Sequence, residues 1–187
     1  MIENKIIDIK LHNIQSIEKM ADILQLLNTY KQNKNVYKIT LNLNSKKIDE
    51  YNCESLFTDM TKLSRVEEFS LDIRNNWIMD NGVNYISEFI IFSKPLKKLR
   101  LNLYNNEIKD DGLVYLGDSL SYAKHIQNLY IDLAYNEFSR KGLNTLMLNL
   151  KKMDSIQSLY LNFKKDRIND SDCLTISDGI EPLKTLK

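Results

Sequence analysis

The sequence predicts an α/β solenoid, a horseshoe with a parallel sheet on its concave face and helices on its convex face. Two observations predict it. Apolar residues recur every 30 positions along the 187 residues, and within each unit their spacing changes from alternation to a helical period. Strands pack roughly 4.8 Å apart and helices about 8–10 Å apart, so a stack of such units has to curve with its strands inside.

The repeat covers the chain, which is predicted to be a single domain over residues 1–187. Six units of about 30 residues start near positions 6, 36, 66, 96, 126 and 156, and the beginning of a seventh is placed at 183. Counted from each start, apolar residues stand at offsets 3, 5, 7, 12, 17, 20 and 24. In the unit that starts at Leu96 they are Leu99, Leu101, Leu103, Ile108, Leu113, Leu116 and Leu120.

Each unit predicts a strand, then a loop, then a helix. The run 99–103 alternates apolar and polar residues, which is typical of a strand with one buried face. From offset 16 onward the apolar residues follow i, i+3 and i+7, which indicates an amphipathic helix.

Two residue types recur just before the helix. Aspartates stand at offset 14 and are expected to cap the helix that follows: Asp80, Asp110 and Asp170. Glycines stand at offset 16, where either a positive φ or a close approach of the backbone would require them: Gly82, Gly112 and Gly142.

Both ends of the chain depart from the pattern. In the first unit Asn13 replaces an apolar strand residue, and an amphipathic segment over 20–30 is expected to form an N-terminal cap. At the other end, Leu183 and Leu186 are expected to begin a strand that no helix follows. This open C-terminal edge predicts either a fragment of a longer protein or a partner that completes the stack.

Composition excludes several classes of partner. The net charge is +1, from 26 basic and 25 acidic residues, so no bulk field favours nucleic acid or an anionic membrane. No apolar run approaches the roughly 20 residues of a membrane span, and the N-terminus does not resemble a secretory signal, so a cytoplasmic protein is expected. Cys53 and Cys173 lie four units apart, too far to pair, and both are expected to fill the core.

The pattern Leu-x-x-Leu-x-Leu-x-Leu-x-x-Asn-x-Ile-x-x-x-Gly runs from Leu96 to Gly112 and nearly repeats from Ile126 to Gly142. It resembles the ribonuclease-inhibitor class of leucine-rich repeat, in a longer-strand variant frequent in ciliate proteins. The resemblance implies a binding scaffold rather than an enzyme. It also implies that the loop asparagines hydrogen-bond the neighbouring backbone: Asn76, Asn106 and Asn136.

Residues that alternate with the buried strand positions face the concave side. Tyrosine and arginine dominate interface hot spots, because they combine large, fairly rigid area with a polar end. The predicted partner-binding residues are therefore Arg74, Arg100, Tyr104, Tyr130, Tyr135 and Tyr160, together with Trp77 in a loop. The alternative is that these tyrosines only stack on their neighbours in the sheet and that the tryptophan packs across adjacent loops.

Catalytic signatures are missing from the sequence. The two histidines, His12 and His125, lie about four units apart and cannot form a metal pair or a dyad. No glycine-rich phosphate loop is present. We therefore expect no enzyme activity, no metal, no cofactor and no small-molecule substrate.

The predicted function is a non-catalytic protein–protein interaction scaffold, a module or subunit of a larger intracellular assembly. Its partner would be another protein, bound through the concave face and the open C-terminal edge. One alternative is a structural subunit of a ciliary or cytoskeletal complex. The other is a GTPase-activating protein, because activators of nuclear-transport GTPases share this repeat class; Asn76, Asn106, Asn136 or Arg74 would then act at the rim.

Overall fold

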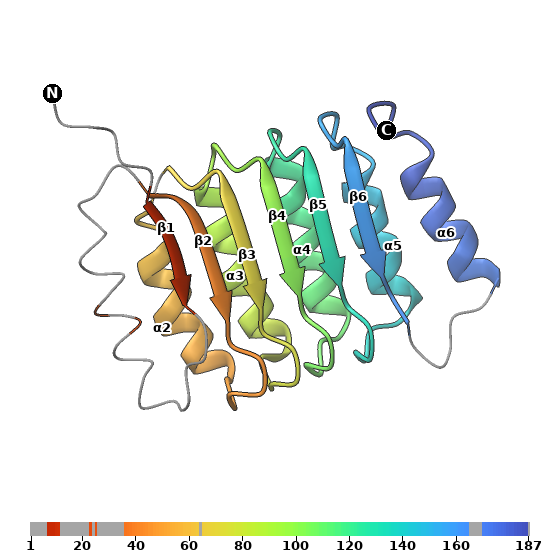
Figure 1. Ribbon diagram of the computed structural model, residues 1–187. Helices are drawn as coiled ribbons and strands as arrows, with labels where there is room; N and C mark the ends of the chain where they lie inside the picture. The colour runs from red at the N-terminus through yellow and green to blue at the C-terminus, as the bar shows by residue number, and fades with distance from the viewer. Residues whose placement is uncertain are drawn as a thin grey trace, which may run out of the picture.

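A computed structural model describes residues 7–11, 23, 25, 36–63, 65–164 and 170–186. Within them, six parallel strands form one sheet in chain order (Figure 1). The strands are β1 (Ile7–Leu11), β2 (Val36–Asn42), β3 (Glu68–Asp72), β4 (Lys98–Asn102), β5 (Asn128–Asp132) and β6 (Ser158–Asn162). The predicted α/β class with a parallel sheet is therefore confirmed.

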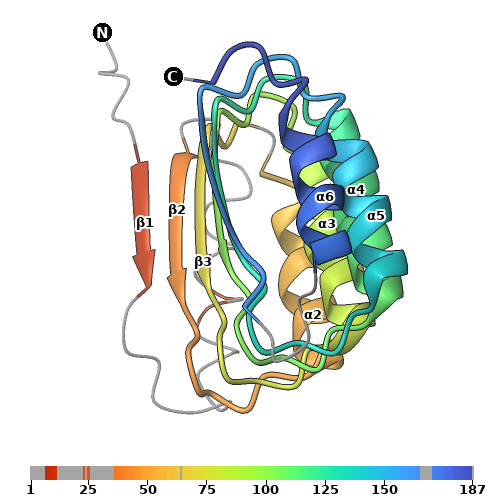
Figure 2. The ribbon, with the colours of Figure 1, turned by 90° about the vertical axis from the view of Figure 1, so that its right-hand side faces the viewer.

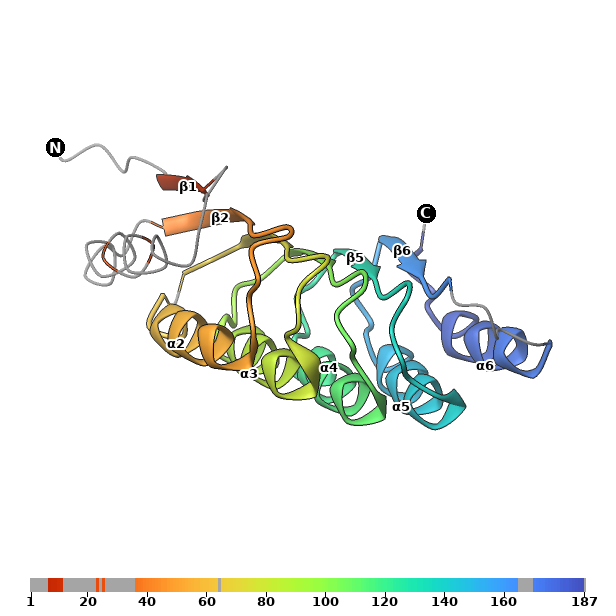
Figure 3. The same ribbon diagram turned by 90° about the horizontal axis from the view of Figure 1, so that it is seen from below.

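The described helices form a second layer on one face of the sheet (Figure 2). They are α2 (Glu50–Met60), α3 (Met79–Phe92), α4 (Asp110–Tyr122), α5 (Arg140–Leu150) and α6 (Asp170–Ile180). The row of helices is spread more widely than the row of strands (Figure 3), as the wider spacing of packed helices requires. None of the described helices is both long and apolar enough to cross a membrane.

An apolar spine runs through the stack between the two layers. Leu101 on β4 pairs in register with Leu71 on β3 and Ile131 on β5, and all three side chains are fully buried. Fully burying one such side chain stabilises a fold by about 1.5–3 kcal/mol. Equivalent apolar residues pair in register from β2 to β6, so these units bury their apolar faces against their neighbours.

The offset-14 aspartates cap helices, but not the helices that we expected. Asp80 lies in the first turn of α3, and its Oδ1 accepts from the N–H groups of Lys109 and Gly112 at the start of α4, at 2.7 and 2.9 Å. Asp110 likewise caps the start of α5 in the following unit. The side chain of Asp170 lies outside the described part. The prediction of a cap within one unit was wrong, because the carboxylate sits already inside its own helix and its nearest free N–H groups belong to the next.

This arrangement explains the glycines at offset 16. A Cβ on Gly112 would lie 2.6 Å from Asp80 Oδ1 of the preceding unit and 2.6 Å from Ile108 Cγ2 of its own unit, and a Cβ on Gly142 would lie 2.6 Å from Asp110 Oδ1. No described glycine has a positive φ. Close approach, rather than backbone conformation, therefore requires glycine at these two positions.

Replacing Asp110 with Asn tests this cap through its pH dependence. Burial opposes ionisation of Asp110, yet hydrogen bonds from the Ser139 hydroxyl and N–H and from the Gly142 N–H lower its pKa. The ionised group therefore stabilises the fold above its unfolded pKa of about 3.9, and this contribution is lost as the pH falls through the folded pKa. We expect Asp110→Asn to cost about 1 kcal/mol in urea unfolding at pH 7 and almost nothing at pH 2. Equal costs of Asp110→Asn at both pH values would contradict this role.

The implied role of the loop asparagines is confirmed by the hydrogen bonds. Asn76 Oδ1 accepts from the N–H groups of Lys46 and Ile48, at 3.0 and 2.9 Å, and its Nδ2 donates to the Leu43, Ile73 and Arg74 carbonyls. Asn136 makes the equivalent five bonds two units further on. Each side chain thus ties the loop of one unit to the loop before it.

Two expectations for the C-terminal units need correction. The N–H of Leu186 donates to Leu183 O as the N–H of Ile126 donates to Ala123 O, so Leu186, not 183, occupies the start of the seventh unit and the period stays at 30. Cys53 is buried, but Cys173 on α6 is exposed. The outer side of α6 has no described helix against it, so the core position of this unit is left open. The expected N-terminal cap falls on residues of which only Ile23 and Gln25 are described.

Candidate protein-binding face

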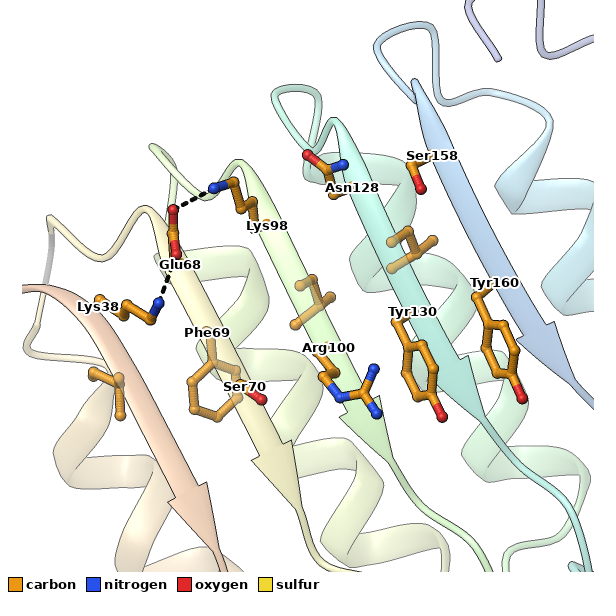
Figure 4. A pocket seen from close by; sticks show the side chains of 13 residues that line it. Lys38, Glu68, Phe69, Ser70, Lys98, Arg100, Asn128, Tyr130, Ser158 and Tyr160 are labelled. Carbon is orange, nitrogen blue, oxygen red and sulfur yellow. Dashed lines mark hydrogen bonds and ion pairs between the residues drawn. The ribbon is translucent and has the colours of Figure 1, made fainter. Parts of the chain in front are cut away.

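The face of the sheet opposite the helices carries no other described element; we call it the open face (Figure 2). Two rows of side chains run across it in strand register. One row is Lys38, Glu68, Lys98, Asn128 and Ser158, and the next is Thr40, Ser70, Arg100, Tyr130 and Tyr160. Between these rows lies a shallow hollow of about 280 Å³ (Figure 4).

Three side chains from three neighbouring strands stack on one another in this hollow. The Arg100 guanidinium carbon lies 3.5 Å from the centre of the Tyr130 ring. The Tyr130 and Tyr160 rings lie 4.2 Å apart with an angle of 3° between their planes. We call Arg100, Tyr130 and Tyr160 the aromatic ladder; Figure 4 shows them side by side. Burial raises the pKa of Tyr130, although the Arg100 charge opposes the rise, so its hydroxyl stays protonated at neutral pH.

Charged side chains flank the aromatic ladder. Glu68 on β3 lies between Lys38 on β2 and Lys98 on β4, with N–O distances of 3.2 and 2.6 Å (Figure 4). The hydrogen bond from Lys98 is the main cause that lowers the pKa of Glu68. Exposed pairs of this kind contribute little stability, so their main effect is to hold charge in a fixed pattern beside the hollow.

A second aromatic pair lies where the strands end. The Tyr104 and Tyr135 rings are 4.9 Å apart, and Lys164 Nζ lies 5.8 Å from the Tyr135 ring. Arg74 occupies the position of Tyr104 one unit earlier, and its Nε lies 3.4 Å from Asp72 Oδ1.

The structure therefore brings five of the predicted residues into two groups, the stacked aromatic ladder and the pair Tyr104 and Tyr135, whose rings are tilted by 49°. Arg74 and Trp77 contact neither group in any described ring or ion-pair interaction. Tyr130 and Tyr160 stack on each other, as the alternative to partner binding expects, yet Tyr160 still exposes 46% of its surface.

Sequence reasoning missed the row of Lys38, Glu68 and Lys98, which forms one wall of the hollow. The alternation extends one step further toward the N-terminus, so this row could have been found by counting back two residues from Thr40, Ser70 and Arg100.

Side chains with catalytic potential do not gather in the described part of the chain. It contains no group of three residues arranged to hold a metal ion. Burial raises the pKa of the Cys53 thiol, which disfavours the thiolate needed for nucleophilic attack. What the open face offers is stacked rings, fixed charges and hydroxyl groups, which suit recognition of another molecule rather than bond making.

No model of a protein family matches the sequence, and no curated protein matches it. In structure the chain is similar to the C-terminal domain of tropomodulin from Caenorhabditis elegans, with a TM-score of 0.62 and 15% identity over 87% of this chain and 92% of that one. It is also similar to actin-binding site 2 of leiomodin-1, with a TM-score of 0.60 and 13% identity over 92% of this chain and 90% of that one. These likenesses show a shared leucine-rich-repeat-like fold with a parallel sheet.

Proposed function

We propose that the protein is a non-catalytic module that binds another protein through the open face, with the aromatic ladder at the centre of the contact. The observation that carries this proposal is the stacking of Arg100, Tyr130 and Tyr160 on a face that no other described element covers. Arginine and tyrosine are enriched at interface hot spots. Stacking already restricts the rotamers of these three side chains, so they lose less conformational entropy when a partner binds.

The setting that we propose is a cytoskeletal assembly in the cytoplasm. The likeness to actin-binding site 2 of leiomodin-1 favours this alternative over an unspecified scaffold, and it makes actin the first partner to test. The sequence pattern is what supports assigning the repeat to the ribonuclease-inhibitor class. The proposal of a ciliary location is supported by the repeat variant alone.

We also propose that the chain is a single horseshoe-shaped domain whose C-terminal edge is a secondary contact. Beside the edge of β6 that no described strand pairs with lies a hollow of about 620 Å³ that is lined mainly by apolar side chains. Leu159 and Leu161 on β6 are only partly buried, whereas Leu129 and Ile131 on β5 are buried by the next unit. A strand with unpaired backbone groups and apolar neighbours favours the addition of another strand.

GTPase activation has less support from the site. The amide groups of Asn76, Asn106 and Asn136 bond the backbone of the stack, and Arg74 lies beside Asp72. Their roles are those of structural loop residues rather than of groups that reach toward a nucleotide.

Sedimentation with actin filaments tests the proposal. We expect the wild type to sediment with filaments and the double variant Tyr130→Ala/Tyr160→Ala to bind at least about tenfold more weakly, because hot-spot residues each contribute about 2 kcal/mol or more. The matched control is Tyr122→Ala, since Tyr122 on α4 is 71% exposed on the helix layer. Unchanged affinity of the double variant, with its fold confirmed by circular dichroism, would remove the aromatic ladder from the interface.

A further inference from the structure

The loop asparagines Asn76, Asn106 and Asn136 form a row through the stack, which we call the asparagine ladder, and this row lacks hydrogen bonds at one loop. Asn76 and Asn136 each accept two backbone N–H groups through Oδ1. Asn106 lies between them in the stack and is fully buried, yet its Oδ1 has no hydrogen-bond partner. By the repeat, its two donors should be the N–H groups of Asn76 and Ile78, on either side of Trp77.

The backbone of the Trp77 loop explains the missing bonds. Where the ladder is intact, the residue between the two donors is left-handed: Lys47 has a φ of 59° and Glu107 a φ of 57°. Such a residue turns the N–H groups on either side of it toward one acceptor. Trp77 occupies this position without a positive φ, and the left-handed conformation falls instead on Met79, with a φ of 52°. With the left-handed residue displaced to Met79, the N–H groups of Asn76 and Ile78 are not turned toward Asn106 Oδ1.

This conformation destabilises the loop and exposes apolar surface. A buried acceptor without a donor costs free energy relative to the intact loops. In return, Trp77 is 51% exposed and Met79 is 42% exposed at the same rim of the sheet. Departures from local rules of this kind gather at functional sites.

The charges around Trp77 indicate what would bind there. The three adjoining loops, 46–50, 75–81 and 105–111, carry six carboxylates and three lysines; two of the carboxylates, Asp80 and Asp110, cap helices of the following units. The Trp77 N–H bonds Ile48 O, which places it beside Asp49, and the Met79 N–H bonds Asn106 O, which places it beside Glu107. An exposed indole beside carboxylates favours a cation over its face.

We propose that the Trp77 loop docks a lysine- or arginine-bearing segment of a partner protein and that the irregular loop is kept because it presents the tryptophan. This inference deepens the proposed function and rests on the protein being a binding module. It does not depend on the aromatic ladder, which lies on the open face. It predicts that replacing Trp77 raises the stability of the fold and lowers the affinity for the partner.

Because Trp77 is the only tryptophan in the chain, its fluorescence reports on the loop directly. We expect titration with a hexa-arginine peptide to produce a saturable change in Trp77 emission that weakens as salt is raised. A hexa-glutamate peptide should produce none. The variant Tyr130→Ala/Tyr160→Ala should bind the arginine peptide as the wild type does, so a failure of this site and a failure of the open face are distinguishable. No response to hexa-arginine, or an equal response to hexa-glutamate, would overturn the proposal.

A pair of substitutions tests the link to stability. Asparagine adopts a positive φ readily, so Trp77→Asn should let the loop follow the regular course and should satisfy Asn106. We expect its Tm to rise by about 2–4 °C, while its affinity for a labelled hexa-arginine peptide, measured by anisotropy, falls at least about fivefold. The control Trp77→Phe keeps a bulky ring and should leave the Tm unchanged and the affinity within about threefold. A lower or unchanged Tm for Trp77→Asn, or an unchanged affinity, would overturn the proposal.

Discussion

Replacing Asn136 with alanine is expected to lower the free energy of unfolding by about 3 kcal/mol or more, because five hydrogen bonds in a buried loop are lost together. Its Oδ1 accepts from Asn106 N and Ile108 N, and its Nδ2 donates to the carbonyls of Leu103, Leu133 and Ala134. With alanine, the N–H groups of Asn106 and Ile108 lose this acceptor, whereas Leu103 O and Ala134 O keep the bonds from Asn106 Nδ2 and Asn105 N. Urea unfolding followed by circular dichroism measures the loss.

Asn106→Ala is the matched control for this prediction. Asn106 donates to three carbonyls as Asn136 does, but its Oδ1 accepts no bond. Its replacement therefore removes three bonds instead of five and also removes an unpaired acceptor. We expect it to cost about 1–2 kcal/mol less than Asn136→Ala. If the two variants lose the same stability, the broken ladder at Trp77 is not a real feature of the folded protein.

Leu101→Ala is expected to cost about 2–5 kcal/mol, because it opens a cavity in the middle of the apolar spine. Leu101 is fully buried between Leu71 and Ile131, and the strands on both sides hold these neighbours in register. For a domain of this size, 1 kcal/mol corresponds to a shift in Tm of about 2–4 °C, so a fall of roughly 5–15 °C is expected. Differential scanning calorimetry measures it.

The control for this variant lies on the same strand. Lys98 is on β4 with its side chain exposed on the open face, so Lys98→Ala should change the stability by no more than about 1 kcal/mol. A small effect of Leu101→Ala, or effects of equal size for the two positions, would contradict the stacked core.

The core of the fold could be predicted from the sequence because the same spacing of apolar residues recurs in successive units. Leu71, Leu101 and Ile131 stand 30 residues apart, and burial against equal neighbours allows only one register. The helix caps could not be predicted in the same way. One unit viewed alone places Asp110 before its own helix, whereas its nearest unpaired N–H groups lie in the next unit, at Ser139 and Gly142.

The candidate site could be predicted as a column of residues but not as a set of contacts. Alternation identifies which side chains face away from the core, and so it found Arg100, Tyr130 and Tyr160. It does not give rotamers, which decide that these three stack and that Tyr104 meets Tyr135 instead. The irregular loop at Trp77 was also beyond reach, because it depends on a single backbone conformation and not on a pattern.

Hydroxyl-radical footprinting of the tyrosines, with and without actin filaments, tests most directly the claim that the open face is the contact surface. We expect protection at Tyr130 and Tyr160 on the open face and none at Tyr122 on the helix layer, which is 71% exposed. Protection of Tyr122 with unchanged labelling of Tyr130 and Tyr160 would place the partner on the opposite side of the protein and would contradict this account.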